Sequence, residues 1–193
     1  MPELEDLLDE LQSDDLSRAE AAATALPEFG DPALTELGSL LAGGDADARW
    51  WAVRALAGFP AEQAGKLLVT GLADPEVSVR HCAALALSTQ PHAPAIGPLL
   101  DLLGSQDSLL ARLAGDALVA SGSHAVQGLL ETIAQDSAQV KGEAARALAL
   151  IGDTRAIPTL FSLLESESAL LEHWASAGLA KMGVGMSFFK AGP

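Results

Sequence analysis

Tyrosine is absent from this 193-residue chain, and aromatic residues make up only 4% of it. β-Branched residues are modest in number, whereas alanine and leucine dominate the 49% of the sequence that is hydrophobic. Strands favour aromatic and β-branched residues, while helices favour alanine and leucine. The hydrophobic share is also well above that of disordered chains. The composition therefore predicts a packed, helical protein.

Cysteine is almost absent too, and the single Cys82 excludes an internal disulfide or a cysteine-rich metal site. The chain starts with acidic residues (Glu3, Glu5 and Asp6), so it lacks the basic segment and apolar core of a secretory signal. No apolar run reaches the length needed to span a bilayer. We expect a cytoplasmic protein without a membrane partner.

Basic residues are scarce, with 11 lysines and arginines against 26 aspartates and glutamates. The formal net charge is -15 at pH 7. Such a chain is repelled by nucleic-acid phosphates and by anionic membrane surfaces. We therefore expect no nucleic-acid partner and no membrane partner, unless a local basic strip overrides the overall charge.

One short pattern, best seen in residues 48–56, recurs six times along the chain. With Arg49 counted as position zero, the pattern has alanine at +3, a small residue at +4, another at +6, and leucine at +7. The closing leucines are separated by 30, 31, 31, 30 and 31 residues: Leu26, Leu56, Leu87, Leu118, Leu148 and Leu179. A period this regular indicates a helical-repeat architecture.

Each repeat is predicted to contain two helices. The first, helix A, carries leucines at 3–4 spacing, such as Leu37, Leu40 and Leu41, which form an apolar stripe. The second, helix B, carries the alanine-rich pattern, and its small residues allow close approach of neighbouring helices. Aspartate or serine in the turn between them is expected to cap helix B, and glycine or proline at +11 to end it.

The sequence thus predicts an all-α fold, a right-handed α-solenoid of six two-helix repeats over residues 1–183. The expected repeats are about 1–31, 32–61, 62–92, 93–122, 123–152 and 153–183. Residues 184–193 form a tail with Met186, Phe188 and Phe189. These apolar residues are expected to cover the open end of the last repeat or to contact another protein.

Residues 45–56 and 75–87, with the Gly-Asp turn at 152–160, resemble the short HEAT-like repeats first associated with phycobilin lyases. The resemblance covers nearly the whole chain and implies that helix B lines a concave face. Because such repeats occur in bilin lyases, in a deoxyhypusine hydroxylase and in plain scaffolds, the resemblance does not fix the function.

Eight of the 11 basic residues fall on predicted B helices. One interpretation is a groove for an acidic partner segment. The other is a ladder in which a turn aspartate pairs with the basic residue four to six positions on, or with that of the next repeat. The ladder is favoured for Arg49, Arg80 and Lys141, whereas Arg54 and Arg146, at +5, are candidates for the groove.

The +1 position of each B helix is also predicted to face the groove, and it is occupied by Trp50, His81, Arg112 and His173 in four repeats. Trp50 and Arg54 have the i, i+4 spacing that allows a cation–π contact. Tryptophan and arginine are frequent binding hot spots. Trp51, at +2, is expected to lie in the core.

Catalytic signatures are missing. The His-Glu dipeptides that resemblance to a di-iron hydroxylase would require are absent, and the four histidines are too scattered to share a metal ion. Cys82 is expected to be a buried, unreactive thiol. Gly43-Gly44 lacks the residues of a phosphate-binding loop. We expect no cofactor, no metal and no enzymatic activity.

These observations predict a non-catalytic protein-interaction scaffold or adaptor, monomeric or weakly dimeric, that binds a partner protein. The candidate binding residues are Trp50, Arg54, His81, Arg112, Arg146 and His173. The alternative is a bilin-lyase-like enzyme subunit, or an accessory subunit of an enzyme complex. In that case Arg54, Arg80 and Arg112 would hold the propionate groups.

Overall fold

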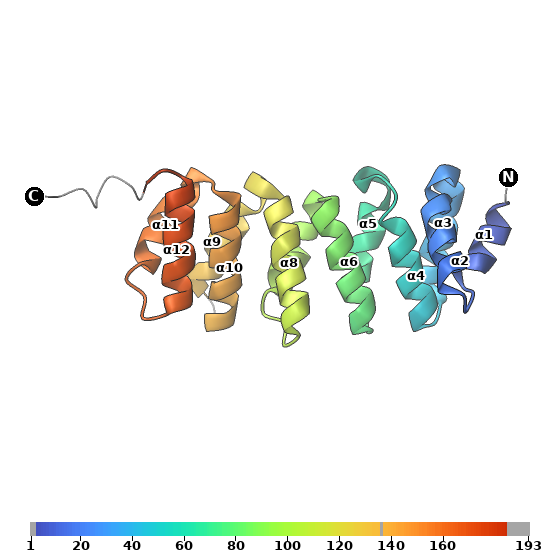
Figure 1. Cartoon of the computed structure of the whole chain (residues 1–193), viewed down its shortest axis with the longest axis horizontal. Helices are drawn as coiled ribbons and strands as arrows, with labels where there is room; N and C mark the ends of the chain where they lie inside the picture. Colours follow the sequence, from blue (N-terminus) through green and yellow to red (C-terminus); the bar gives the residue numbers. More distant parts are fainter. Residues whose placement is uncertain (1–2, 136, 185–193) are drawn as a thin grey trace, which may run out of the picture. The chain divides into compact units, whose positions relative to one another are not determined.

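The computed structural model describes residues 3–135 and 137–184. The described residues are helical, without any strand, which confirms the predicted all-α solenoid of two-helix repeats. The α-helices are α1 (Leu4–Leu11), α2 (Leu16–Ala25), α3 (Asp31–Gly43), α4 (Ala46–Leu56), α5 (Ala61–Gly71), α6 (Val77–Thr89), α7 (Ile96–Leu102), α8 (Ser108–Ala120), α9 (Val126–Gln135), α10 (Ala138–Ile151), α11 (Ile157–Leu163) and α12 (Ala169–Lys181) (Figure 1). Short 3-10 helices lie between some of them: η1 (Leu26–Phe29), η2 (Ala93–Ala95), η3 (Gly122–His124) and η4 (Thr154–Ala156).

The chain forms two compact units, Met1–Pro98 and Leu99–Pro193, and the boundary between them falls within α7. In the first unit, α1 packs on α2, α3 on α4, and α5 on α6, while α4 also contacts both α2 and α6. In the second unit, α9 packs on α10 and α11 on α12, while α10 contacts both α8 and α12. The alanine-rich helices therefore stack on one another within each unit, as expected for repeats that bury their apolar faces only against neighbouring repeats.

Small residues at +3 and +6 are required by this stacking. The +3 alanines from Ala52 to Ala175 are completely buried. At +6, a Cβ added to Gly178 would lie 2.9 Å from the Ala149 Cα on α10 and 2.9 Å from Leu160 Cδ1 on α11. The last alanine-rich helix thus approaches both its own helix A and the preceding helix B too closely for a side chain. This confirms the predicted reason for small residues in the pattern.

Turn residues begin and end the helices largely as the sequence predicts. Asp15, Asp45 and Asp107 are N-caps whose carboxylates accept backbone N–H groups at the starts of α2, α4 and α8. Asp74 differs, because Glu76 is the N-cap of α6. Glycines at the +11 position adopt positive φ angles, which favour glycine. They are Gly30, Gly122, Gly152 and Gly183.

None of the helices in the described part of the chain is long and apolar enough to cross a membrane. The predicted role of Met186, Phe188 and Phe189 falls outside the described residues.

Candidate functional site

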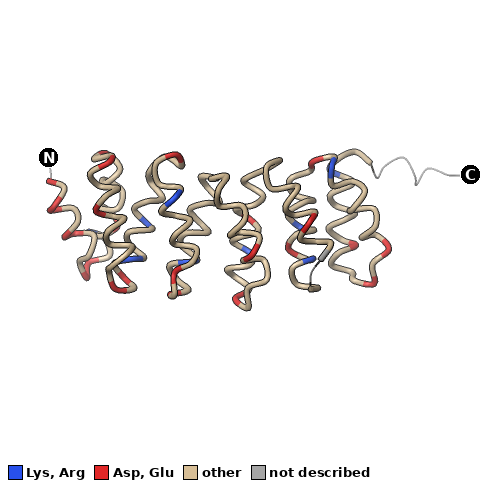
Figure 2. Tube along the Cα trace, turned by 180° about the vertical axis from the view of Figure 1, so that it is seen from behind, with Lys and Arg blue, Asp and Glu red and all other residues tan. Residues whose placement is uncertain are grey.

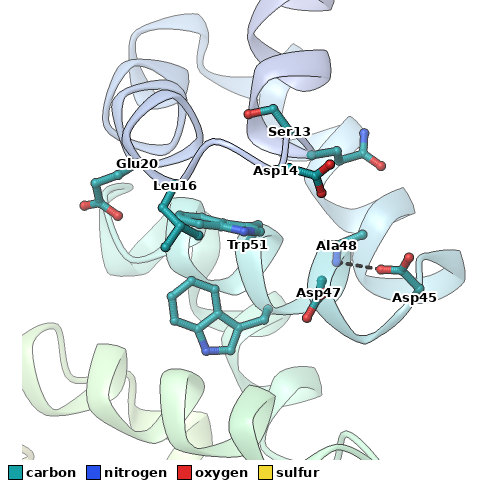
Figure 3. Close-up of a pocket in the computed structure, with 10 residues that line it drawn as sticks. Ser13, Asp14, Leu16, Glu20, Asp45, Asp47, Ala48 and Trp51 are labelled. Carbon is teal, nitrogen blue, oxygen red and sulfur yellow. Dashed lines mark hydrogen bonds between the residues drawn. The ribbon is translucent and has the colours of Figure 1, made fainter.

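An open pocket of about 730 Å³ lies in the first unit, where the start of α2 faces the start of α4 (Figure 3). We call it the α2–α4 pocket. Its lining comes from the turn after α1, from α2, and from α4 with its N-cap: Gln12, Ser13, Asp14, Leu16, Glu20, Asp45, Asp47, Ala48, Trp50 and Trp51. Its volume is within the range of roughly 300–1,000 Å³ typical of ligand pockets.

Two adjacent indoles form the aromatic part of this pocket. The rings of Trp50 and Trp51 meet edge to face, with centroids 4.9 Å apart and planes at 88°. Both side chains are half-buried. The prediction that Trp51 lies in the core is therefore wrong, because an indole is much larger than the alanine and thiol at this position in the neighbouring repeats, and it reaches the pocket surface. Leu16 adds apolar surface and is 72% exposed.

Four carboxylates surround the indoles, while the pocket lining contains no lysine or arginine. In Figure 3, Asp14 and Asp47 lie on one side of Leu16 and Trp51, and Glu20 lies on the other. Asp45 accepts a 2.9 Å hydrogen bond from the Ala48 backbone N–H, and its charge also interacts with Arg49.

Glu20 is ion-paired with the Arg54 Nη2 from α4. Arg54 was predicted to be available for binding on the same face as Trp50, and it lies half-exposed on the same helix, α4. Because its guanidinium is ion-paired with Glu20 on α2, Arg54 helps to join α4 to α2 and compensates the negative charge of that pocket carboxylate.

Arg49 and Asp74 form a two-bond ion pair between neighbouring repeats in the first unit. Arg49 Nε and Nη2 donate to the two Asp74 carboxylate oxygens at 2.8 and 2.9 Å, and the Asp74 side chain is only 5% exposed. Arg80 Nη1 donates to the Asp74 backbone carbonyl at 2.6 Å. Asp74 therefore binds the arginine of the preceding repeat through its carboxylate, a pairing that the sequence-based prediction did not include, and it binds Arg80, six positions on, through its backbone carbonyl.

Arg146 is not available for binding, which corrects its assignment as a groove residue. Its side chain is 2% exposed, and its guanidinium donates to Asp116 Oδ1 and Glu143 Oε2, both at 2.8 Å. It also donates to the Arg112 carbonyl at 3.2 Å. The reason lies one repeat back: a Cβ added to Gly115 would be 2.7 Å from Arg146 Nη2, so the missing side chain leaves room for the buried guanidinium.

The remaining candidates are distributed over both units. His81 is half-buried on α6, and Arg112 is exposed on α8, 3.7 Å from Asp116. His173 is exposed on α12 and contacts Trp174 edge to face. Arg112 and Trp174 line a second, smaller pocket of about 320 Å³ in the second unit. Trp50 is thus the one predicted binding residue that lines the α2–α4 pocket. Of the pocket carboxylates, Glu20 shares the +1 position that was predicted to face the groove, but none of the four was predicted to bind a partner.

Most lysines and arginines of the alanine-rich helices bind acceptors in the chain itself. Figure 2 shows many acidic residues at turns and helix ends, with the basic residues along the helices between them. Seven of the eight make a hydrogen bond or ion pair: Arg18, Arg49, Arg54, Arg80, Arg112, Arg146 and Lys181. A basic groove for an acidic segment is therefore not supported by these side chains.

Burial raises the pKa of the Cys82 thiol to about 11, so the thiol is protonated at neutral pH and is a poor nucleophile. Among the described residues, no group of three or more His, Cys, Asp or Glu side chains could hold a metal ion.

Replacing Asp74 with asparagine is expected to lower the thermal midpoint at neutral pH and to lose this effect in acid. Hydrogen bonding to Arg49 lowers the pKa of Asp74, so the unfolded chain protonates this residue first as the pH falls. The stabilisation is complete above about pH 4, the ordinary aspartate value, and disappears as the pH falls through the lowered folded-state pKa. Thermal midpoints measured from neutral to acidic pH test this expectation. Asp101→Asn, an exposed aspartate on α7, is the control, and a deficit of the Asp74 variant that does not change with pH would contradict it.

The HEAT repeats family model matches residues 4–87, 34–119 and 126–186, which together include most of the sequence. The chain belongs to the HEAT repeat family. This confirms the resemblance seen in the sequence. No curated protein matches the chain.

Solved structures similar to this HEAT-repeat chain include the archaeal HEAT-like repeats protein from Thermococcus onnurineus NA1, with a TM-score of 0.67 and 17% identity over 94% of this chain and 81% of that one. The complex of CpcE and CpcF of phycocyanin lyase from Nostoc sp. PCC7120 matches with a TM-score of 0.55 and 24% identity, over 95% of this chain and 78% of that one. A designed armadillo repeat protein in complex with the peptide (KR)4 matches with a TM-score of 0.54 and 21% identity, over 94% and 100%. At these identities the similarities show the fold.

Proposed function

We propose that this HEAT-repeat chain is a non-catalytic scaffold that binds an extended segment of a partner protein in the α2–α4 pocket. The observation that carries the proposal is the pair of half-buried indoles, Trp50 and Trp51, in an open pocket beside the exposed Leu16. Tryptophans that are partly desolvated in a concave surface are typical binding hot spots. When a partner covers apolar surface that is exposed to water in this way, the burial favours binding.

The repeat architecture supports the same function. Stacked helices form a rigid support, so the pocket is preorganised and little conformational entropy is lost on binding. The structural neighbours include a designed armadillo repeat protein in complex with a peptide and the complex of CpcE and CpcF, and both support partner binding by a fold of this kind.

A bilin-lyase-like role receives less support from the arginines that it would require. Arg54 is paired with Glu20, and Arg80 donates to the Asp74 and Pro75 carbonyls. Arg112 is the most available of the three, since its 3.7 Å contact with Asp116 is long for an ion pair. One available arginine is a poor site for a group with two propionates.

Selection of displayed random peptides on the immobilised full chain tests the proposal. We expect peptides enriched on the wild type to lose at least about tenfold in affinity for a Trp50→Ala and Trp51→Ala double variant, because these residues supply the hot spot. The control double variant, Leu85→Ala with Leu109→Ala, removes exposed leucines of α6 and α8 that lie outside the pocket. Peptides that bind both double variants equally well, or no enrichment on the wild type, would contradict the proposal.

A further inference from the structure

The charges around the α2–α4 pocket indicate what kind of segment it accepts. Of its four carboxylates, Glu20 is ion-paired with Arg54, and Asp45 lies within the electrostatic reach of Arg49. Asp45 is bound by a neutral backbone N–H, and no ion pair is made by Asp14 or Asp47 within residues 3–135 and 137–184. The carboxylates of Asp14 and Asp47 therefore keep uncompensated negative charge beside the indoles.

We propose that the bound segment is cationic and places a lysine or arginine side chain in this pocket, between the indoles and the carboxylates. This inference rests on the proposed function and specifies the chemistry of the partner. A guanidinium or ammonium group is attracted to the face of an indole, most strongly when it is partly desolvated. The aliphatic stem of the same side chain packs on apolar surface such as Leu16, while its charged end stays near the carboxylates.

Arginine suits this combination particularly well, because its planar fork can bind a carboxylate with two hydrogen bonds and stack on an aromatic ring at the same time. Asp14 and Asp47 lie on the side of the pocket opposite Glu20 in Figure 3, so a cation entering beside Trp51 has carboxylates on both sides. Neither aspartate must break an ion pair within the described residues to bind it.

The second pocket provides an internal comparison. It also contains a tryptophan, Trp174, but its charged lining residues are Arg112, Arg146 and Glu143. Since Arg146 is bound to Glu143, the exposed Arg112 leaves that pocket without excess negative charge. Cation selectivity is therefore expected at the α2–α4 pocket and not at the Trp174 pocket.

The net charge of the chain acts in the same direction at longer range. At -15, its field attracts cationic segments and speeds their encounter with the pocket. This field alone would attract a cation to any face. The test must therefore separate the local carboxylates from the overall charge.

Isothermal titration of the full chain with three short synthetic peptides of equal length makes this separation. One peptide is rich in arginine and lysine, and in the others glutamine or glutamate replaces every basic residue. We expect the basic peptide to bind at low salt at least about tenfold more tightly than the glutamine peptide, and the glutamate peptide not to bind measurably. The affinity should fall as salt rises.

Two double variants with the same net charge provide the matched comparison. The Asp14→Asn and Asp47→Asn double variant should bind the basic peptide about five- to tenfold more weakly than the wild type. The Glu36→Gln and Glu62→Gln double variant, with changes on exposed parts of α3 and α5, should alter this affinity by less than about twofold. Circular dichroism confirms that each variant is folded. Equal losses in the two variants would overturn the proposal, because they would show attraction by net charge alone.

Failure of the cationic inference can be told apart from failure of the proposed function. If the glutamine or glutamate peptide binds as tightly as the basic one, and this binding is lost in the Trp50→Ala and Trp51→Ala variant, the pocket is a binding site but not a cation site. If no peptide binds and none was enriched in the selection, both proposals are wrong. Sedimentation can also show that the wild type is a dimer, that this tryptophan variant is a monomer, and that no peptide binds. This result would assign the pocket to a second copy of the chain and overturn the cationic inference.

Discussion

Replacing Arg146 with alanine is expected to lower the free energy of unfolding by about 3 kcal/mol. The guanidinium is 2% exposed and holds Asp116 and Glu143, which lie on neighbouring alanine-rich helices. Its loss leaves a cavity beside Gly115 and removes the positive charge between two carboxylates. The expected loss lies at the low end of the range for broken buried ion pairs, roughly 3–5 kcal/mol, because both carboxylates keep some contact with water.

Urea unfolding followed by circular dichroism measures this effect, and two further variants separate its causes. Arg146→Met keeps much of the packing of the stem, and we expect it to lose less stability than the alanine variant. Arg112→Ala removes an exposed arginine from α8 and should change the unfolding free energy by no more than about 0.5 kcal/mol. An Arg146→Ala variant as stable as Arg112→Ala would show that the guanidinium is not buried between the helices.

Replacing Leu87 with alanine is expected to cost about 2–5 kcal/mol. Leu87 closes the repeated pattern on α6 and is 1% exposed. Because each repeat is stabilised mainly by its neighbours, a cavity at this position weakens the packing of α6 against its partner helices.

Leu85→Ala is the matched control for this second variant, since it makes the same chemical change on the same helix. Leu85 is 54% exposed, and its replacement should shift the unfolding free energy by about 0.5 kcal/mol or less. Thermal and urea unfolding of both variants provide the measurement. Equal destabilisation by the two changes would be incompatible with the register assigned to the repeat.

The period of the sequence was sufficient to predict the helices and their packing. Residues at +3 must be small wherever neighbouring helices touch, and Ala52 and Ala175 at this position are fully buried in the two units. The turns were predictable for a similar local reason, because an aspartate such as Asp45 or a glycine such as Gly152 satisfies a helix end without help from distant residues.

Side chains at one register position had different environments that the period alone could not predict. Arg54 and Arg146 both occupy +5, but Arg54 is half-exposed and Arg146 is buried. The difference depends on the residue one repeat earlier, which is Ala23 before Arg54 and Gly115 before Arg146. Gly115 is the only glycine at +4 in the six repeats, and this was the available sequence signal for a buried arginine.

The pocket was missed for a related reason. The 100° separation between successive helical residues suggested that Trp50 and Trp51 point to different environments, but two indoles are large enough to meet at 4.9 Å and line one pocket. Its acidic residues come from the turn after α1, from α2 and from the start of α4, so only the folded chain brings them together.

The indole N–H signals of the three tryptophans give the most direct test of cation binding at the α2–α4 pocket. In proton–nitrogen NMR spectra of the full chain, addition of the arginine- and lysine-rich peptide should shift the signals of Trp50 and Trp51 and leave that of Trp174 in place. Single tryptophan-to-phenylalanine variants assign the three signals. A titration in which the Trp174 signal alone moves, or in which the glutamate peptide shifts Trp50 and Trp51 as strongly as the basic one, would contradict the proposed site.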